Sequence, residues 1–278
     1  MRICSLVMLA AAVAWPVTTA VAASGAGQTV AVVDNANASG QGGSRTLAAG
    51  SEIFVGDTVA TDATGEAQIR FGDGTRMVVG AGSSLVIDEA LFRGAASENK
   101  FAVRALGGAF RFISGDSGDK DYKIRTPSAT IGVRGTAFDI IVFTDANGKT
   151  HTKVLALEDE VTLCGEDEQG NQTECETVAT PCAILQTEDE DDDQVEAIPY
   201  SEGKSDKIHE EFPYAKSQDK LEDDFRVAGV PCVLGGLAAA GLTGSSLATV
   251  GGIAAVAVAI GVIIAVSGKN NSNNNTNN

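Results

Sequence analysis

The stretch that predicts the fold most directly is YKIRTPSATIGVRGTAFDIIV, Tyr122 to Val142. Apolar side chains occupy every second position, as half-buried strands require, in the runs Tyr122/Ile124, Ala129/Ile131/Val133 and Phe138/Ile140/Val142. Pro127 has no amide proton to donate, so it belongs at a strand start or a bend. Gly132 and Gly135 suit a bulge or a tight corner. The stretch predicts three consecutive strands.

The same alternation continues on both sides of this stretch. Short alternating runs recur from Gly50 to Leu163, and the dipeptides Asp73-Gly74 and Asn147-Gly148 are typical of hairpin turns. No long pattern with a period of 3.6 residues interrupts them, so parallel β-α-β units are not expected. We predict an all-β fold, with one compact domain of short strands over residues 50–165. Its arrangement is a roll, a sandwich or a solenoid-like stack.

The N-terminus has the pattern of a secretory signal peptide. Arg2 precedes an apolar run, and small residues follow up to Ala22. We therefore expect residues 1–22 to be removed and the protein to be exported to the periplasm. Residues 23–49 are rich in small and polar side chains, and we expect them to form a flexible segment with one edge strand.

Four cysteines remain once Cys4 leaves with the leader, and an even number in an oxidising compartment suggests two disulfides. Four cysteines allow three pairings. We favour Cys164–Cys175, because their flanking sequences read as the two strands of a hairpin around a polar loop; Cys182–Cys232 then follows by elimination. The spacing does not fit a paired C-x-x-C zinc site. We expect neither a metal site nor a cofactor.

The formal net charge of −17 is concentrated in one region. Residues 158–226 hold 23 of the 37 acidic residues and five of the 20 basic ones, whereas residues 50–157 hold 13 acidic and 12 basic residues. Runs such as Glu188–Asp193 repel themselves and remain solvated, so we predict an acidic linker over residues 166–226. A nucleic-acid partner is not expected, because phosphates require a basic surface.

The last part of the chain is apolar. Residues 227–268 are rich in glycine and alanine, and Leu247–Val266 is a run of 20 residues without a charge. A helix of that length crosses about 30 Å of hydrocarbon, and small residues spaced four apart allow helices to approach closely in lipid. We predict a transmembrane helix over residues 247–266, with a buried helical hairpin as the alternative. An Asn-rich tail follows over residues 269–278.

Several blocks, occurring in order, resemble the FecR-type domain, the extracytoplasmic β-domain of iron-dicitrate sensors and of other exported bacterial proteins. The blocks are GDTVAT at residues 56–61, GEAQIRFGDGT at residues 65–75, GAF at residues 108–110 and TPSATIGVRGTAF at residues 126–138. Asp159 stands where the family usually has glycine, and aspartate also tolerates a left-handed turn. The resemblance implies a sensing domain outside the cytoplasm. Because a leader precedes it, we expect a stand-alone exported form without the cytoplasmic anti-sigma segment of the classical sensors.

Arg134 is the candidate site residue that we single out. It lies between Gly132 and Gly135 on a strand that looks buried, and a buried arginine needs an acceptor. Asp139 or Glu158 could supply that carboxylate. In the functional interpretation, Gly132, Arg134 and Gly135 mark an open strand edge at which a partner docks.

Two functions remain open. The first is an exported binding and sensing module, anchored in the inner membrane by its C-terminal segment, which docks an envelope protein or a ligand. The second is a structural or assembly protein, whose Gly/Ala-rich C-terminus forms homo-oligomers or anchors a rigid β-domain. The sequence contains no recognisable catalytic motif, so no enzyme activity is expected.

Overall fold

The computed structural model describes residues 25–40, 43–91, 100–115, 122–167, 169–187, 194–199, 205–228 and 232. These residues belong to one compact unit, and 59% of them lie in strands, as the alternating pattern predicted. The predicted leader, transmembrane helix and Asn-rich tail lie outside the described residues. Among those that are described, no helix is both long and apolar enough to cross a membrane.

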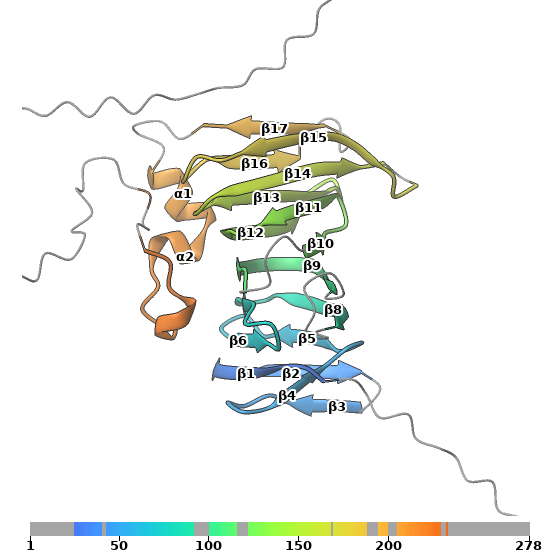
Figure 1. Cartoon of the computed structure of the whole chain (residues 1–278), viewed down its shortest axis with the longest axis vertical. Coiled ribbons are helices and arrows are strands. Elements are labelled where there is room, and N and C mark those ends of the chain that lie inside the picture. Colours follow the sequence, from blue (N-terminus) through green and yellow to red (C-terminus); the bar gives the residue numbers. More distant parts are fainter. Residues whose placement is uncertain are drawn as a thin grey trace, which may run out of the picture. The chain divides into compact units, whose positions relative to one another are not determined.

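The strands of the described residues are linked by backbone hydrogen bonds into one mixed sheet (Figure 1). The strands are β1 (Gly25–Val33), β2 (Ala36–Gly40), β3 (Gly43–Thr46), β4 (Glu52–Phe54), β5 (Thr58–Thr61), β6 (Glu66–Phe71), β7 (Arg76–Val79), β8 (Ser84–Leu91), β9 (Lys100–Ile113), β10 (Tyr122–Arg125), β11 (Ala129–Arg134), β12 (Ala137–Thr144), β13 (Thr150–Ala156), β14 (Glu160–Glu166), β15 (Gln172–Val178), β16 (Ile184–Thr187) and β17 (Val195–Ile198). Strands β9 and β10 pair in parallel.

Strand β9 divides this sheet into two leaves. Its first half pairs with β8 and β10, and its second half pairs with β7 and β12. Leaf A runs β4-β1-β6-β7-β9-β12-β13-β16-β17, and leaf B runs β3-β2-β5-β8-β9-β10-β11-β14-β15. Between the halves, Gly108 has a φ of +105°, and a Cβ there would lie 2.1 Å from Ser83 Oγ. Only glycine fits this crossover.

The core lies between the two leaves. One cluster of buried apolar side chains draws on both of them. Phe71 of leaf A contacts Phe101 of leaf B with ring centroids 4.8 Å apart, and Phe112 of leaf A contacts Tyr122 of leaf B at 5.4 Å. Burial of each such side chain contributes about 2 kcal/mol. The apolar positions that the alternation assigned to the core therefore do face it.

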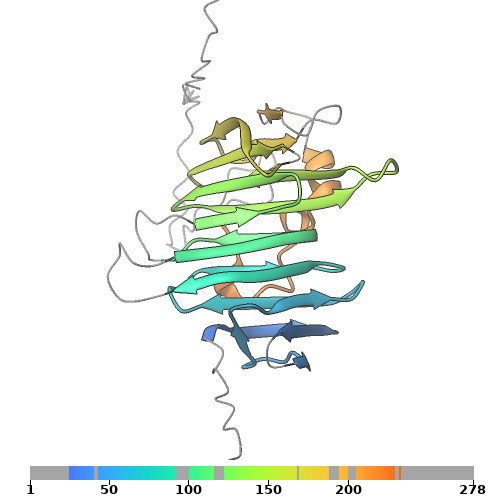
Figure 2. The same ribbon diagram turned by 90° about the vertical axis from the view of Figure 1, so that its right-hand side faces the viewer.

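A cover segment, residues 205–228, lies on the outer face of leaf A, along one side of the strands (Figures 1 and 2). Its helices are α1 (Ser205–Glu211), α2 (Pro213–Lys216) and the 3-10 helix η2 (Asp223–Phe225). Phe212 is buried in one cluster with Leu155 of β13, and Phe225 is buried in another with Val78 of β7. The outward face of this leaf is therefore a second apolar interface.

Two segments that were expected to be a flexible segment and a solvated linker are folded instead. The described part of residues 23–49 forms strands, and β1 pairs on both sides, with β4 and with β6, inside leaf A. The described part of residues 166–226 contributes β15, β16, β17 and the cover segment instead of a solvated linker. The acidic composition predicts a solvated segment, but the apolar residues between the acidic ones pack into the core and against the outer face of leaf A. Asp159 adopts a φ of +43°, so the left-handed turn expected there is confirmed.

Candidate functional site

Arg134 lies inside leaf B and not at its edge. Strand β11 pairs with β10 on one side and with β14 on the other, so the expected open edge at Gly132, Arg134 and Gly135 is wrong. The Arg134 side chain is exposed and lies opposite Glu160 in the strand register. Gly135 has a φ of +60° in the turn that leads into β12. Arg134 therefore belongs to the outer face of leaf B.

The buried arginine is Arg111 on β9. It lies directly opposite Asp139 on β12, and its Nε and Nη2 atoms donate to the two carboxylate oxygens at 2.7 and 2.9 Å. The Arg111 and Asp139 side chains are 0% and 1% exposed. Complete burial raises the pKa of Asp139, and the guanidinium offsets part of that rise. Asp139 is thus the acceptor for an arginine, but not for Arg134.

The cover segment closes over this ion pair. Gln218 accepts a hydrogen bond from Arg111 Nη1, and the Tyr214 ring lies 5.5 Å from the guanidinium carbon. Gln218 also accepts a hydrogen bond from the backbone N–H of Val227 and donates one to the Val227 carbonyl. A buried ion pair is costly unless its remaining donors are satisfied. Because the cover segment supplies an acceptor, the ion pair and the segment stabilise each other.

A cavity of about 320 Å³ opens beside this network, between leaf A and the cover segment. Its lining includes Glu66, Ala81, Ala109, Pro213, Tyr214 and Leu221. The Glu66 carboxyl accepts hydrogen bonds from Gln68 Nε2 at 2.9 Å and from the Tyr214 hydroxyl at 3.2 Å. Burial raises the pKa of Glu66, and burial together with Glu66 raises the pKa of Tyr214, which remains a hydrogen-bond donor. The contacts hold α2 against β6.

We expect Glu66→Gln to reduce the pH dependence of stability. The folded-state pKa of Glu66 is raised above its ordinary value of 4.5, so the folded protein binds this proton more tightly than the unfolded chain does. Stability from this group is complete below the unfolded-state pKa and falls as the pH rises through the folded-state pKa. Glutamine cannot ionise, yet it keeps an acceptor oxygen for Tyr214.

Urea unfolding midpoints across the acidic and neutral range measure this effect. The wild-type midpoint should fall more than that of Glu66→Gln as the pH rises. Glu222→Gln changes an exposed carboxyl of the same cover segment and is the matched control. Parallel pH profiles for wild type and Glu66→Gln would contradict the prediction.

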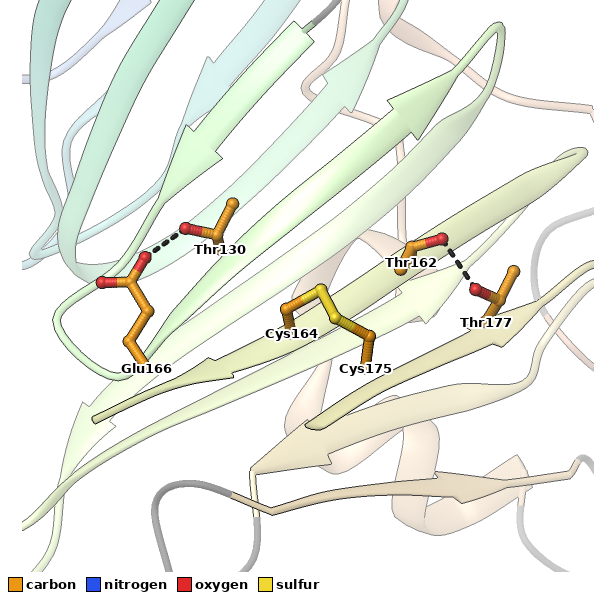
Figure 3. Close-up of a disulfide and its surroundings, with 6 residues drawn as sticks. All are labelled: Thr130, Thr162, Cys164, Glu166, Cys175 and Thr177. Atoms are coloured by element: carbon orange, nitrogen blue, oxygen red, sulfur yellow. Dashed lines mark hydrogen bonds between the residues drawn. A yellow bond between two sulfur atoms is a disulfide. The ribbon is translucent and has the colours of Figure 1, made fainter. Parts of the chain in front are cut away.

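Both disulfides favoured from the sequence are present. Cys164 on β14 is joined to Cys175 on β15 (Figure 3), and Cys182 is joined to Cys232. Cys232 follows the cover segment, whereas Cys182 precedes β16 of leaf A. The second disulfide therefore attaches the chain beyond the cover segment to the leaf that the segment covers.

The Cys182→Ser/Cys232→Ser variant should lose about 4 kcal/mol of unfolding free energy. The disulfide constrains the unfolded chain, and its partners are separated by 50 positions, against 11 for Cys164–Cys175. Urea unfolding of this variant and of Cys164→Ser/Cys175→Ser gives the comparison. A larger loss for Cys164→Ser/Cys175→Ser than for Cys182→Ser/Cys232→Ser would contradict the loop-length argument.

The sequence did not reveal the network of Arg111, Glu66 and Tyr214. The available signal was a polar residue between two apolar ones, as at Arg111 between Phe110 and Phe112. That pattern is typical of a side chain that faces solvent. Here the outward side chain of Arg111 is buried instead, because the cover segment lies over this face of leaf A. No group of three or more His, Cys, Asp or Glu residues that could hold a metal occurs in the described ranges.

Comparison with known proteins matches residues 57–162, from the residue before β5 into β14, to the family model "FecR protein". No curated protein sequence matches the chain. Two crystal structures of a "putative anti-sigma factor" from Parabacteroides distasonis are similar, both at 13% identity, with TM-scores of 0.41 and 0.40. The matches cover 55% and 54% of this chain and 63% and 62% of those chains, less than two thirds of their length.

Proposed function

Because residues 57–162 of this chain are a FecR domain, we propose that the protein is a non-catalytic binding and sensing module of the cell envelope. It is exported by its leader, anchored in the inner membrane by residues 247–266, and docks a protein partner outside the cytoplasm. The family of the domain and the mostly-β fold support a role as a non-catalytic binding and sensing module. The leader pattern and the uncharged C-terminal run of the sequence support the location.

The observation that carries the docking proposal is the difference between the two outer faces. On leaf A the cover segment buries outward side chains completely, including Val78, Arg111 and Leu155. On leaf B five outward side chains of β9, β10 and β11 are exposed, namely Arg104, Leu106, Lys123, Arg125 and Arg134, whereas Thr130 of β11 is buried. An exposed face of this kind is available to a partner.

The strand register brings these side chains together. Arg125 lies beside Arg104 across the parallel pair β9–β10, and Lys123 lies beside Gly132 across β10–β11. Arg104 Nε and Nη2 donate to the carboxylate of Asp88, which fixes the guanidinium on the face. A hollow of about 520 Å³ lies over this part of leaf B, lined in part by Asp88, Lys123 and Arg125. Arginine is enriched in protein interfaces, and the exposed Leu106 adds apolar contact area.

Photo-crosslinking in cells tests the docking face. A photoreactive amino acid is placed at Lys123 or Arg134 on leaf B, and at Asp223 on the exposed side of the cover segment as the control. We expect a discrete adduct from the two leaf B positions only, and its loss when Arg125→Glu is added. Adducts of equal yield from both faces, or adducts only to second copies of the chain, would contradict the proposal.

Membrane fractionation tests the anchor separately. The full-length protein should resist alkaline extraction from membranes, and deletion of residues 247–266 should release it. A soluble oligomer of high mass would contradict the anchor and favour the assembly function of the Gly/Ala-rich C-terminus instead.

A further inference from the structure

We propose that the outer edge of β15 binds an extended, basic segment of a partner protein as an added strand. The inference rests on the proposed docking function and specifies the kind of partner. It concerns the backbone edge of leaf B, whereas the docking face above consists of side chains in the middle of that leaf.

Strand β15 is the longest terminal strand of the described sheet. It pairs with β14 on one side and with no described strand on the other. The other terminal strands, β3, β4 and β17, have four, three and four residues, whereas β15 has seven. Short terminal strands protect a sheet against unwanted pairing, and a long exposed one invites an added strand. β15 contains no proline, and its only charged residues are Glu174 and Glu176, which disfavour pairing with another acidic strand.

The register shows which backbone groups face outward. The Cα atoms of Cys164 and Cys175 are 4.0 Å apart, the close spacing of an antiparallel pair that does not exchange backbone hydrogen bonds. The N–H and C=O of Cys175 therefore point away from β14. Because strands repeat with a period of two, those of Thr177 do the same. Both residues are exposed.

The edge is already ordered for a partner. On the outer face of leaf B, the Cys164–Cys175 disulfide and the hydrogen bond between the Thr162 and Thr177 hydroxyls, at 2.8 Å, join β15 to β14 (Figure 3). A strand that is held in its bound conformation loses less conformational entropy on binding. The added strand would thus gain backbone hydrogen bonds without a further ordering cost in β15.

Charge specifies the occupant. β15 carries Glu174 and Glu176 and no basic residue, and no lysine or arginine occurs between Lys153 and Lys204. An extended segment with lysine or arginine on alternate positions complements this edge, since opposite charges on adjacent strands stabilise the pair. A second copy of β15 would bring glutamates against glutamates, which disfavours a homodimer through this edge.

A synthetic peptide of alternating valine and lysine tests the edge, with the full-length exported protein in detergent micelles. Fluorescence anisotropy compares it with two controls: a peptide with glutamate in place of lysine, and a lysine peptide of equal charge interrupted by prolines, which cannot form a strand. Only the uninterrupted lysine peptide should bind. On binding, hydrogen exchange should slow at the amides of Cys175 and Thr177.

Thr177→Pro removes one outward amide without removing a hydrogen bond to β14, and Thr177→Ala keeps that amide. Proline is tolerated on a strand edge whose N–H faces solvent. Thr177→Pro should weaken peptide binding about tenfold, whereas Thr177→Ala should bind as the wild type does. Unchanged circular dichroism shows that the variant is folded. If Thr177→Pro is not folded, the hydrogen-exchange measurement on the wild type decides whether the peptide binds at the edge of β15.

Three results would overturn the inference: equal binding of the proline-interrupted peptide, no added protection at Cys175 and Thr177, or peptide-free dimerisation that protects these amides. The docking function is judged independently. If the edge fails while the Arg134 crosslinks persist, that function stands. If the peptide binds at β15 and the leaf B crosslinks are absent, the docking face alone is wrong.

Discussion

A Val133→Asp variant should lose more than about 5 kcal/mol of unfolding free energy, enough to unfold many domains. Val133 is 8% exposed and belongs to the cluster between the two leaves, so the new carboxylate would be buried without a partner. It would also forfeit the burial of the valine methyl groups. Urea denaturation followed by circular dichroism measures the loss.

Arg134→Asp is the matched control, because it introduces the same side chain one residue later on the same strand. Arg134 is exposed on the outer face of leaf B, so the new carboxylate stays in solvent and its repulsion with Glu160 across the strand pair should cost no more than about 1 kcal/mol. Similar unfolding midpoints for Val133→Asp and Arg134→Asp would show that the two faces of β11 are assigned wrongly.

The second large effect is expected at the buried ion pair. Arg111→Met should cost about 4 kcal/mol, because it leaves the Asp139 carboxylate buried without its partner. It also leaves the Gln218 side chain without the donor that it receives from Arg111. Urea unfolding of the purified variant measures the change.

Arg104→Met is the control for the loss of an arginine, since Arg104 forms a similar ion pair with Asp88 on an exposed face. Exposed pairs are typically worth less than about 1 kcal/mol. The double variant Arg111→Met/Asp139→Leu should recover most of the loss, because apolar residues of similar volume can replace a buried pair. Equal losses for Arg111→Met and Arg104→Met would refute the assigned burial.

Much of the fold could be predicted from local patterns. The alternation at Ile131 and Val133 identified core-facing positions, because a strand directs successive side chains to opposite faces. The motif blocks around Thr126–Phe138 identified the FecR domain that the family match confirms at residues 57–162. The hairpin around Cys164 and Cys175 could be recognised because both strands and their turn are contiguous in the chain.

The candidate site could not be predicted in the same way. The local pattern predicts that Arg134 is buried at an open edge, yet its side chain is exposed and its strand is paired on both sides. An alternating pattern says that two faces differ, but not which strands lie beside a given strand. Pairing of β11 with β14, some thirty positions later along the chain, depends on the assembled sheet.

Local side-chain chemistry was thus enough to establish strands within residues 50–165, their inward faces and the cysteine hairpin, since these depend on near neighbours in the chain. The partnership of Arg111 with Asp139 depends on the pairing of β9 with β12. The burial of Arg111 and the cavity at Glu66 depend on the cover segment, whose contacts Gln218 and Tyr214 lie 107 and 148 positions farther along the chain. In the sequence, short apolar runs between acidic residues look like a linker. They fold only because a large apolar surface is available to bury their apolar side chains. Leaf A provides that surface, and it exists only after the sheet has formed.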